Sequence, residues 1–182
     1  MKVKNRLSLY CSLIFGIIFA IISLLIYGLF YNNTKKSIYS NLEKTAHISA
    51  LFYLEEDELN DREFAKIKAQ FEDIVTDSYY QVYDIHNNIA YGVGVSDVPV
   101  SILDRVRVSR HLSFTTDEYL CYGIFYEDNQ GDFVVIAKSL KSGLTEQVNL
   151  LLWILTSSFI IGLLAIVLLS RWVSRIAYRP FS

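Results

Sequence analysis

Two long runs without a charged residue constrain this chain more than any other feature. The first run separates Arg6 from Lys35 and covers 28 positions, and the second separates Glu146 from Arg171 and covers 24. Each run contains 15 residues of the Leu, Ile, Val or Phe type. At roughly 1.5 Å rise per residue, a helix over either run exceeds the ~30 Å hydrocarbon core of a bilayer. We therefore predict two transmembrane helices, over residues 7–31 and 147–170.

The basic start of the chain raises the alternative of a cleaved signal peptide for the first run. The run is longer than the apolar core of roughly 7–15 residues that such a peptide has. In addition, the segment Phe30-Tyr31-Asn32-Asn33 offers no cleavage site of small residues. The first run is therefore predicted to be an uncleaved membrane anchor.

Charge is distributed unequally between the ends of the chain and its middle. The ends, residues 1–6 and 171–182, carry no acidic residue and six basic ones: Lys2, Lys4, Arg6, Arg171, Arg175 and Arg179. The middle holds the other 11 basic and all 19 acidic residues, a net charge of −8. Because positive flanks stay in the cytoplasm, we predict two cytoplasmic termini and an extracytoplasmic region over residues 32–146. The acidic middle also argues against nucleic acid as a partner.

The first part of the extracytoplasmic region is predicted to be helical. Ile38, Leu42 and Ala46 follow one another at four-residue spacing, and no Gly or Pro interrupts the segment from Asn32 onward. The first membrane helix is therefore expected to continue outward as one long rod. Asn60 and Glu63 form a capping-box pattern, which predicts the start of a second amphipathic helix.

After Ser78 the pattern becomes typical of strands. We predict a hairpin around His86-Asn87-Asn88, a short helix that starts near Ser96-Asp97, a strand over residues 111–115 and a hairpin around Asp128–Gly131. From Lys141 a helix is expected to run into the second span. The fold class that follows is α+β: two transmembrane helices flanking an extracytoplasmic sensor domain of the PAS-like kind, with a long N-terminal helix packed on an antiparallel sheet.

No pattern for catalysis, cofactor binding or metal binding survives inspection. The three histidines do not share metal-ligand spacing, and glycine-rich phosphate loops and nucleophile elbows are absent from the sequence. Cys11 lies in the first span and Cys121 in the outer domain, so the two cysteines are not expected to pair. We predict that these 182 residues hold no catalytic, cofactor or metal site.

Two groups of residues are candidates for ligand contact. Arg105, Arg107 and Arg110 present guanidinium groups that suit an anion such as a carboxylate; alternatively, they form the outer face of a short amphipathic helix. Tyr122 belongs to a set of strand tyrosines that either line a ligand pocket or pack the sheet against the long helix. The sequence leaves both alternatives open.

Several stretches of the chain carry a family resemblance. The segments "FYLEEDEL", "GIFYEDNQGDFVVIAKS" and "SRWVSRIAYRPFS" resemble the N-terminal part of two-component sensor histidine kinases of the membrane-bound type common in Bacteroidota. The resemblance implies a homodimeric input module in the bacterial inner membrane, in contact with lipid, that detects an extracytoplasmic cue. It also implies further domains beyond this chain: a HAMP linker, histidine-bearing dimerisation helices and an ATP-binding domain, with ATP and Mg²⁺ as cofactors and a cytoplasmic response regulator as partner.

Signal relay in such a module is expected to use the helices. Ile38 and Leu42 would pair between two rods, Ser142 and Thr145 would join the sheet to the second span, and a third set would lie at its cytoplasmic end: Arg171, Arg175 and Pro180. A proline at this point is typical of the first turn of a new helix, which predicts a junction into a HAMP-like linker. Two alternatives remain open: a truncated or stand-alone membrane sensor or binding protein without kinase output, and the input half of another receptor class, such as a chemoreceptor or cyclase.

Overall fold

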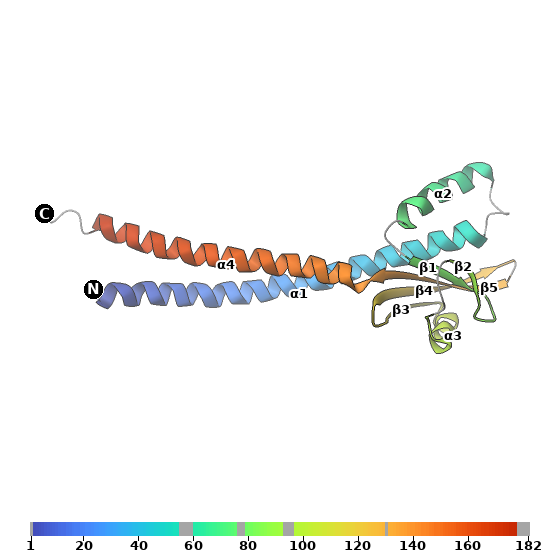
Figure 1. The fold of residues 1–182 in the computed structure, drawn as a ribbon, viewed down its shortest axis with the longest axis horizontal. Helices are drawn as coiled ribbons and strands as arrows, with labels where there is room; N and C mark the ends of the chain where they lie inside the picture. The colour runs from blue at the N-terminus through green and yellow to red at the C-terminus, as the bar shows by residue number, and fades with distance from the viewer. Residues whose placement is uncertain (1, 55–59, 76–78, 93–96, 130, 178–182) are drawn as a thin grey trace. The chain divides into compact units, whose positions relative to one another are not determined.

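The fold was analysed in a computed structural model that describes residues 2–54, 60–75, 79–92, 97–129 and 131–177. Its elements, in chain order, are α1 (Lys2–Leu54), α2 (Asp61–Val75), β1 (Tyr79–Tyr83), β2 (Ile89–Gly92), α3 (Val100–Ser109), β3 (His111–Thr115), β4 (Tyr119–Asp128), β5 (Gly131–Leu140) and α4 (Lys141–Ala177) (Figure 1). This is the order predicted from sequence, and the α+β class is confirmed. The acidic run Glu55–Glu58 and the predicted junction residue Pro180 lie outside the described residues.

The chain divides into two compact units. One unit is Thr34–Leu144, which contains the sheet, and the other combines Met1–Asn33 with Thr145–Ser182. We refer to them as the sheet unit and the helical unit. The sequence placed the corresponding boundaries at residues 32 and 146.

The sheet has five strands, all antiparallel, in the order β2-β1-β5-β4-β3. β4 and β5 pair over their whole length, from Tyr119 opposite Leu140 to Asp128 opposite Gly131. Gly131 begins β5 with φ +138°, and Asn87 in the β1–β2 turn has φ 65°. Left-handed backbone of this kind is the reason that glycine and asparagine mark hairpin turns in sequence. In this strand order β5 is the central strand, with β1 on one side and β4 on the other.

Helices cover both faces of the sheet. The C-terminal part of α1, with α2 beyond it, lies on one face, and α3 lies on the opposite face (Figure 1). The core beneath α3 is made of Tyr83, Val98, Leu103, Val106, Cys121, Val134 and Ile136. Gly123 allows this close packing, because a Cβ atom at that position would lie 2.8 Å from both Val106 Cγ2 and Ile136 Cδ1.

Aromatic side chains join α2 to α1. Phe52 stacks on Phe71 with ring centroids 4.2 Å apart, and the Tyr53 hydroxyl lies 2.7 Å from that of Tyr80 on β1. Of the predicted capping box at the start of α2, the Asn60 cap is confirmed, while the Glu63 carboxylate bonds the Asn60 side chain instead of its backbone N–H. The Asn60 side chain accepts a hydrogen bond from the backbone N–H of Glu63 (3.0 Å) and donates one to its carboxylate (2.6 Å).

The start of α3 differs from the sequence prediction. Asp97 was expected to begin this helix, whereas the helix begins at Val100 with Pro99 in the N-cap position and no side-chain cap. Pro99 has φ −59° and ψ 141°, and a proline restricts the residue before it to extended backbone, which delays the helix. Val98 is buried just ahead of the helix. The Asp97 carboxylate is thus left available for another partner.

Among the described residues, two helical segments, both lying partly in the helical unit, are long and apolar enough to cross a membrane by length and composition. The qualifying segments are Ser12–Leu54 within α1 and Lys141–Leu169 within α4. Their large apolar side chains face outward: Leu24 and Trp153, for example, are 71% and 76% exposed. Apolar surface on this scale is uncommon on soluble monomers and is typical of a surface that contacts a membrane or another protein.

Candidate functional site

A buried lysine is the most unusual polar group of the sheet unit. Lys138 lies on β5, and its side chain is only 5% exposed. Its Nζ donates a hydrogen bond of 2.7 Å to Gln81 Oε1 on β1 and forms an ion pair with the Asp97 carboxylate, which precedes α3. Because an unpaired buried ammonium costs several kcal/mol, these two acceptors are what make the position tolerable. We call this group, with Tyr83, the Lys138 site.

The walls of the site come from the strands on both sides of β5. Tyr79 on β1 and Cys121 on β4 are the direct cross-strand neighbours of Lys138. Gln81 is fixed by a second hydrogen bond, which its Oε1 accepts from the Tyr83 hydroxyl at 2.7 Å. The Gln81 oxygen therefore receives two donors and stays oriented toward Nζ.

The rim of the site is aromatic. Tyr79 and Tyr119 meet edge to face, with ring centroids 6.0 Å apart, although they lie on strands that β5 separates. Tyr79 is exposed and Tyr119 is half-buried. Burial, together with the nearby carboxylates of Glu118 and Asp97, raises the pKa of the Tyr119 hydroxyl. The Tyr119 phenol consequently stays neutral near pH 7 and is able to donate a hydrogen bond at the rim.

Burial is the main influence on the ionisation of Cys121, which lines the site. Burial raises the pKa of the Cys121 thiol to about 11, even though the neighbouring Lys138 charge acts in the opposite direction. The thiol is therefore neutral and unreactive near pH 7, because the thiolate is the nucleophilic form. In the Lys138 site it serves as a small apolar wall.

The site lies next to the start of α4. Lys138 is three residues before Lys141, and no residue separates the end of β5 from the first residue of α4. Lys141 is tied to the β3–β4 turn, because its backbone N–H donates to the Glu118 carbonyl (2.9 Å) and its Nζ to the Asp117 carbonyl (3.1 Å). A shift of the Lys138 backbone on β5 would therefore occur only three residues before the first residue of α4.

Sequence reasoning missed the Lys138 site, although one signal for it existed. Val134, Ile136 and Lys138 alternate along β5 and share the face that packs against α3, so the lysine occupies an inward position. A lysine in phase with core residues was the available clue. Its partners Gln81 and Asp97 were not predictable, since they depend on strand order and on the late start of α3.

Two of the three arginines predicted as anion contacts have separate partners in the structure. Arg107 donates to the Asp104 carboxylate (3.0 Å) and to the Asp84 carbonyl (3.0 Å). Arg110 pairs with Glu127 (2.9 Å) and lies over the Phe125 ring. Arg105 is exposed on α3. The described residues thus hold two of the three guanidinium groups in contacts with the chain's own acceptors.

Tyr122, the fourth predicted ligand contact, lies on the other face of the sheet. It alternates with Cys121 and Gly123, which face α3, and its hydroxyl is close to Glu43 on α1. Burial, followed by the charge and hydrogen bond of Glu43, raises the pKa of Tyr122. The sheet therefore separates Tyr122 from the arginines of α3, and the four residues do not form one site.

The predicted relay residues occupy different environments. Leu42 is fully buried within its own sheet unit, so it is not available to pair with a second copy, and Ile38 is half-buried. Ser142 and Thr145 are exposed in the first two turns of α4. Near the other end of that helix, Arg171 is exposed, and Arg175 is helical with its side chain outside the described residues.

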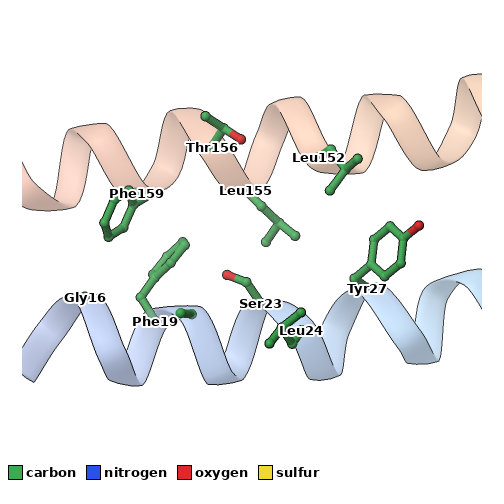
Figure 2. Close-up of a pocket in the computed structure, with 10 residues that line it drawn as sticks. Gly16, Phe19, Ser23, Leu24, Tyr27, Leu152, Leu155, Thr156 and Phe159 are labelled. Atoms are coloured by element: carbon green, nitrogen blue, oxygen red, sulfur yellow. The ribbon is translucent and has the colours of Figure 1, made fainter.

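A groove of about 470 Å³ runs between α1 and α4 within the helical unit. Figure 2 shows Phe19 and Ser23 of α1 facing Leu155 and Phe159 of α4 across it. The ring centroids of Phe19 and Phe159, which both line the groove, lie 5.2 Å apart. Apart from the Ser23, Tyr27 and Thr156 hydroxyls, its lining is apolar.

Neither a metal centre nor a relative emerges. Among the residues that the structure describes, no three His, Cys, Asp or Glu side chains are grouped so that they could hold a metal ion. No protein-family model, curated protein sequence or solved structure matches this chain. Its function has to be argued from its own geometry.

Proposed function

We propose that this chain is the membrane-bound sensory input module of a two-component sensor histidine kinase. In this proposal the sheet unit is an extracytoplasmic domain of the PAS-like kind, and α1 and α4 cross the bacterial inner membrane with both termini in the cytoplasm. The kinase domains, with their ATP and Mg²⁺, and the response regulator would belong to the longer system. The chain would act as a homodimer.

One observation carries the proposal: both long helices continue into the sheet unit without a loop. α1 is helical from Lys2 to Leu54, and α4 begins at Lys141, directly after Leu140 of the central strand β5. A helix that starts at the end of a core strand changes position when the strand does, whereas a flexible linker would absorb the change. This continuity suits transmission of a conformational change between two populations of the sheet unit.

The surface chemistry of the helical unit supports the membrane part of the proposal. Its exposed side chains are predominantly apolar, and Ser157, one of the few polar ones, donates its hydroxyl to the Trp153 and Ile154 carbonyls of its own helix (2.8 and 3.0 Å). In hydrocarbon a hydroxyl needs such an internal partner. The six basic residues of the chain ends favour the proposed orientation.

A dimer contact through the rod needs a different face from the one predicted. Leu42 is buried, whereas the exposed positions of α1 within the sheet unit are all polar: Lys36, Ser37, Ser40, Asn41, Glu43, Lys44 and His47. Dimer contacts through this part of α1 would therefore be polar, and apolar contacts between the long helices would come from the helical unit.

The proposal is tested by fusing residues 1–182 in frame to the cytoplasmic half of a histidine kinase and measuring autophosphorylation in membranes. Thr145→Pro should change the basal rate several-fold, because proline in the second turn of α4 removes a backbone hydrogen bond and clashes with the preceding turn. Ser142→Pro is the matched control: Ser142 is the second residue of α4, where a backbone N–H lacks a helical partner and proline is tolerated.

The two variants differ by three positions in the same helix, so the comparison isolates continuity of the helix. If the Thr145→Pro fusion phosphorylates at the wild-type rate although it is inserted normally, transmission through α4 is excluded. If every fusion is inactive while the isolated kinase half is active, the proposed kinase input role is contradicted in favour of a stand-alone membrane protein.

A further inference from the structure

Lys138 occupies a position that packing alone would fill with an apolar residue. Its neighbours on the same face of β5 are Val134 and Ile136, both fully buried. Replacing a buried ion pair by apolar side chains of similar volume is often neutral or stabilising. Stability therefore does not explain the lysine, and its charge needs another reason.

The two partners of the ion pair differ in exposure. The Lys138 side chain is 5% exposed, whereas that of Asp97 is 47% exposed. The ammonium group is thus reached from solvent on the side that the Asp97 carboxylate occupies. Asp97 fills the position that an external carboxylate would take on Lys138, and it is held by this contact ahead of Pro99 rather than by the α3 helix.

We infer that the Lys138 site binds the carboxylate of a small molecule, which displaces Asp97 from Lys138. The inference rests on the proposed sensory function and names the ligand class of the sheet unit. A carboxylate is indicated because the internal occupant is one, and Gln81 already orients the opposite side of Nζ. The ligand is small, since only a narrow group reaches a side chain so deeply buried. Its remainder would lie beside Tyr79, the cross-strand neighbour of Lys138, and Tyr119, whose ring meets that of Tyr79 edge to face.

Displacement gives the site two states with different consequences for α4. In one, Asp97 ties the start of α3 to the end of β5; in the other, this tie is broken and the ligand holds Lys138, three residues before α4 begins. Because the paired state does not bind ligand, the apparent affinity is reduced by the fraction of chains in which Asp97 occupies the site.

The test uses the full chain in lipid nanodiscs, with sodium acetate and sodium succinate as probes and sodium chloride at equal ionic strength as reference. Thermal midpoints and calorimetric titrations are recorded for wild type, Lys138→Met, Asp97→Asn and Lys68→Met. Lys68 is exposed on α2, so Lys68→Met makes the same charge change away from the site.

At least one carboxylate should stabilise wild type and Lys68→Met relative to chloride, and should leave Lys138→Met unchanged. Asp97→Asn should bind roughly tenfold more tightly, because the internal competitor is gone. If Asp97→Asn does not fold alone, acetate added during refolding should restore it by pairing with Lys138. Chloride should not restore it.

Three results would overturn the inference: no carboxylate effect in wild type, an effect that persists in Lys138→Met, or an Asp97→Asn chain that neither binds more tightly nor is restored by acetate. None of them bears on the fusion experiment with Thr145→Pro, which measures coupling of α4 to a kinase without any ligand. Failure of the ligand class and failure of the sensory function are therefore distinguished.

Discussion

At the scale of single residues, the Cys121 thiol indicates how strongly the core beneath α3 is shielded from solvent. Its thiol pKa is raised from 9.0 to about 11 because burial disfavours the thiolate. A group whose pKa is raised in the folded state stabilises the fold below its unfolded pKa and loses that contribution as pH rises through the folded value. The Cys121 contribution should thus be complete below pH 9 and disappear between about pH 9 and 11.

This loss predicts a pH-dependent difference between wild type and Cys121→Ala. Wild type should lose about 1.4 kcal/mol of unfolding free energy per pH unit above pH 9 through this group, whereas Cys121→Ala lacks the loss. Other alkaline groups, such as Tyr80, titrate in both chains and cancel in the difference. Urea unfolding in detergent micelles at pH 8 and pH 10.5 measures it. A difference that stays constant with pH would show that the thiol is not buried.

At the scale of elements, periodicity was sufficient to predict type and order. Four-residue apolar spacing predicted the part of α1 around Leu42, and the Asn60–Glu63 pair predicted the start of α2. Local signals work for these elements because their causes are local: caps, turns and amphipathic faces. The Lys138 site could not be predicted in the same way, because its members come from β1, β5 and the segment before α3, and strand order is a long-range property.

Contact between α3 and the sheet depends on Gly123, which yields a prediction for the strand–helix interface. Gly123→Ala should destabilise the sheet unit by about 1–3 kcal/mol, because the added methyl group overlaps Val106 and Ile136 in a filled core. Gly143→Ala is the control: a Cβ atom there meets nothing within 4 Å, and the helix α4 should gain roughly 0.5–1 kcal/mol. Thermal unfolding of the two variants should therefore shift in opposite directions. Equal shifts would contradict the tight packing of α3.

At the scale of the whole molecule, charged and apolar side chains are distributed unequally between the two units. The helical unit exposes apolar surface and has basic flanks, while the sheet unit contains every acidic residue of the chain except Glu146. The proposed Lys138 site brings a buried positive charge into this acidic unit. A small carboxylate would be repelled by the surface yet held at the site, which favours selectivity by direct contact over long-range attraction.

In the proposed function, the same charge division would set the orientation of the chain in a membrane, and this is testable. In a background of Cys11→Ala and Cys121→Ala, Lys68→Cys on α2 should react with a membrane-impermeant maleimide added outside intact cells. Reversal of Lys2, Lys4 and Arg6 to Glu should reduce this labelling strongly, because the basic residues flanking the first span dominate orientation. Reversal of Lys35 and Lys36, which follow the first apolar run, changes charge in the favourable direction and should leave labelling intact. If the chain with its native basic residues is not labelled and the chain with Lys2, Lys4 and Arg6 reversed is labelled, the sheet unit lies in the cytoplasm, where an extracytoplasmic carboxylate cannot be its cue.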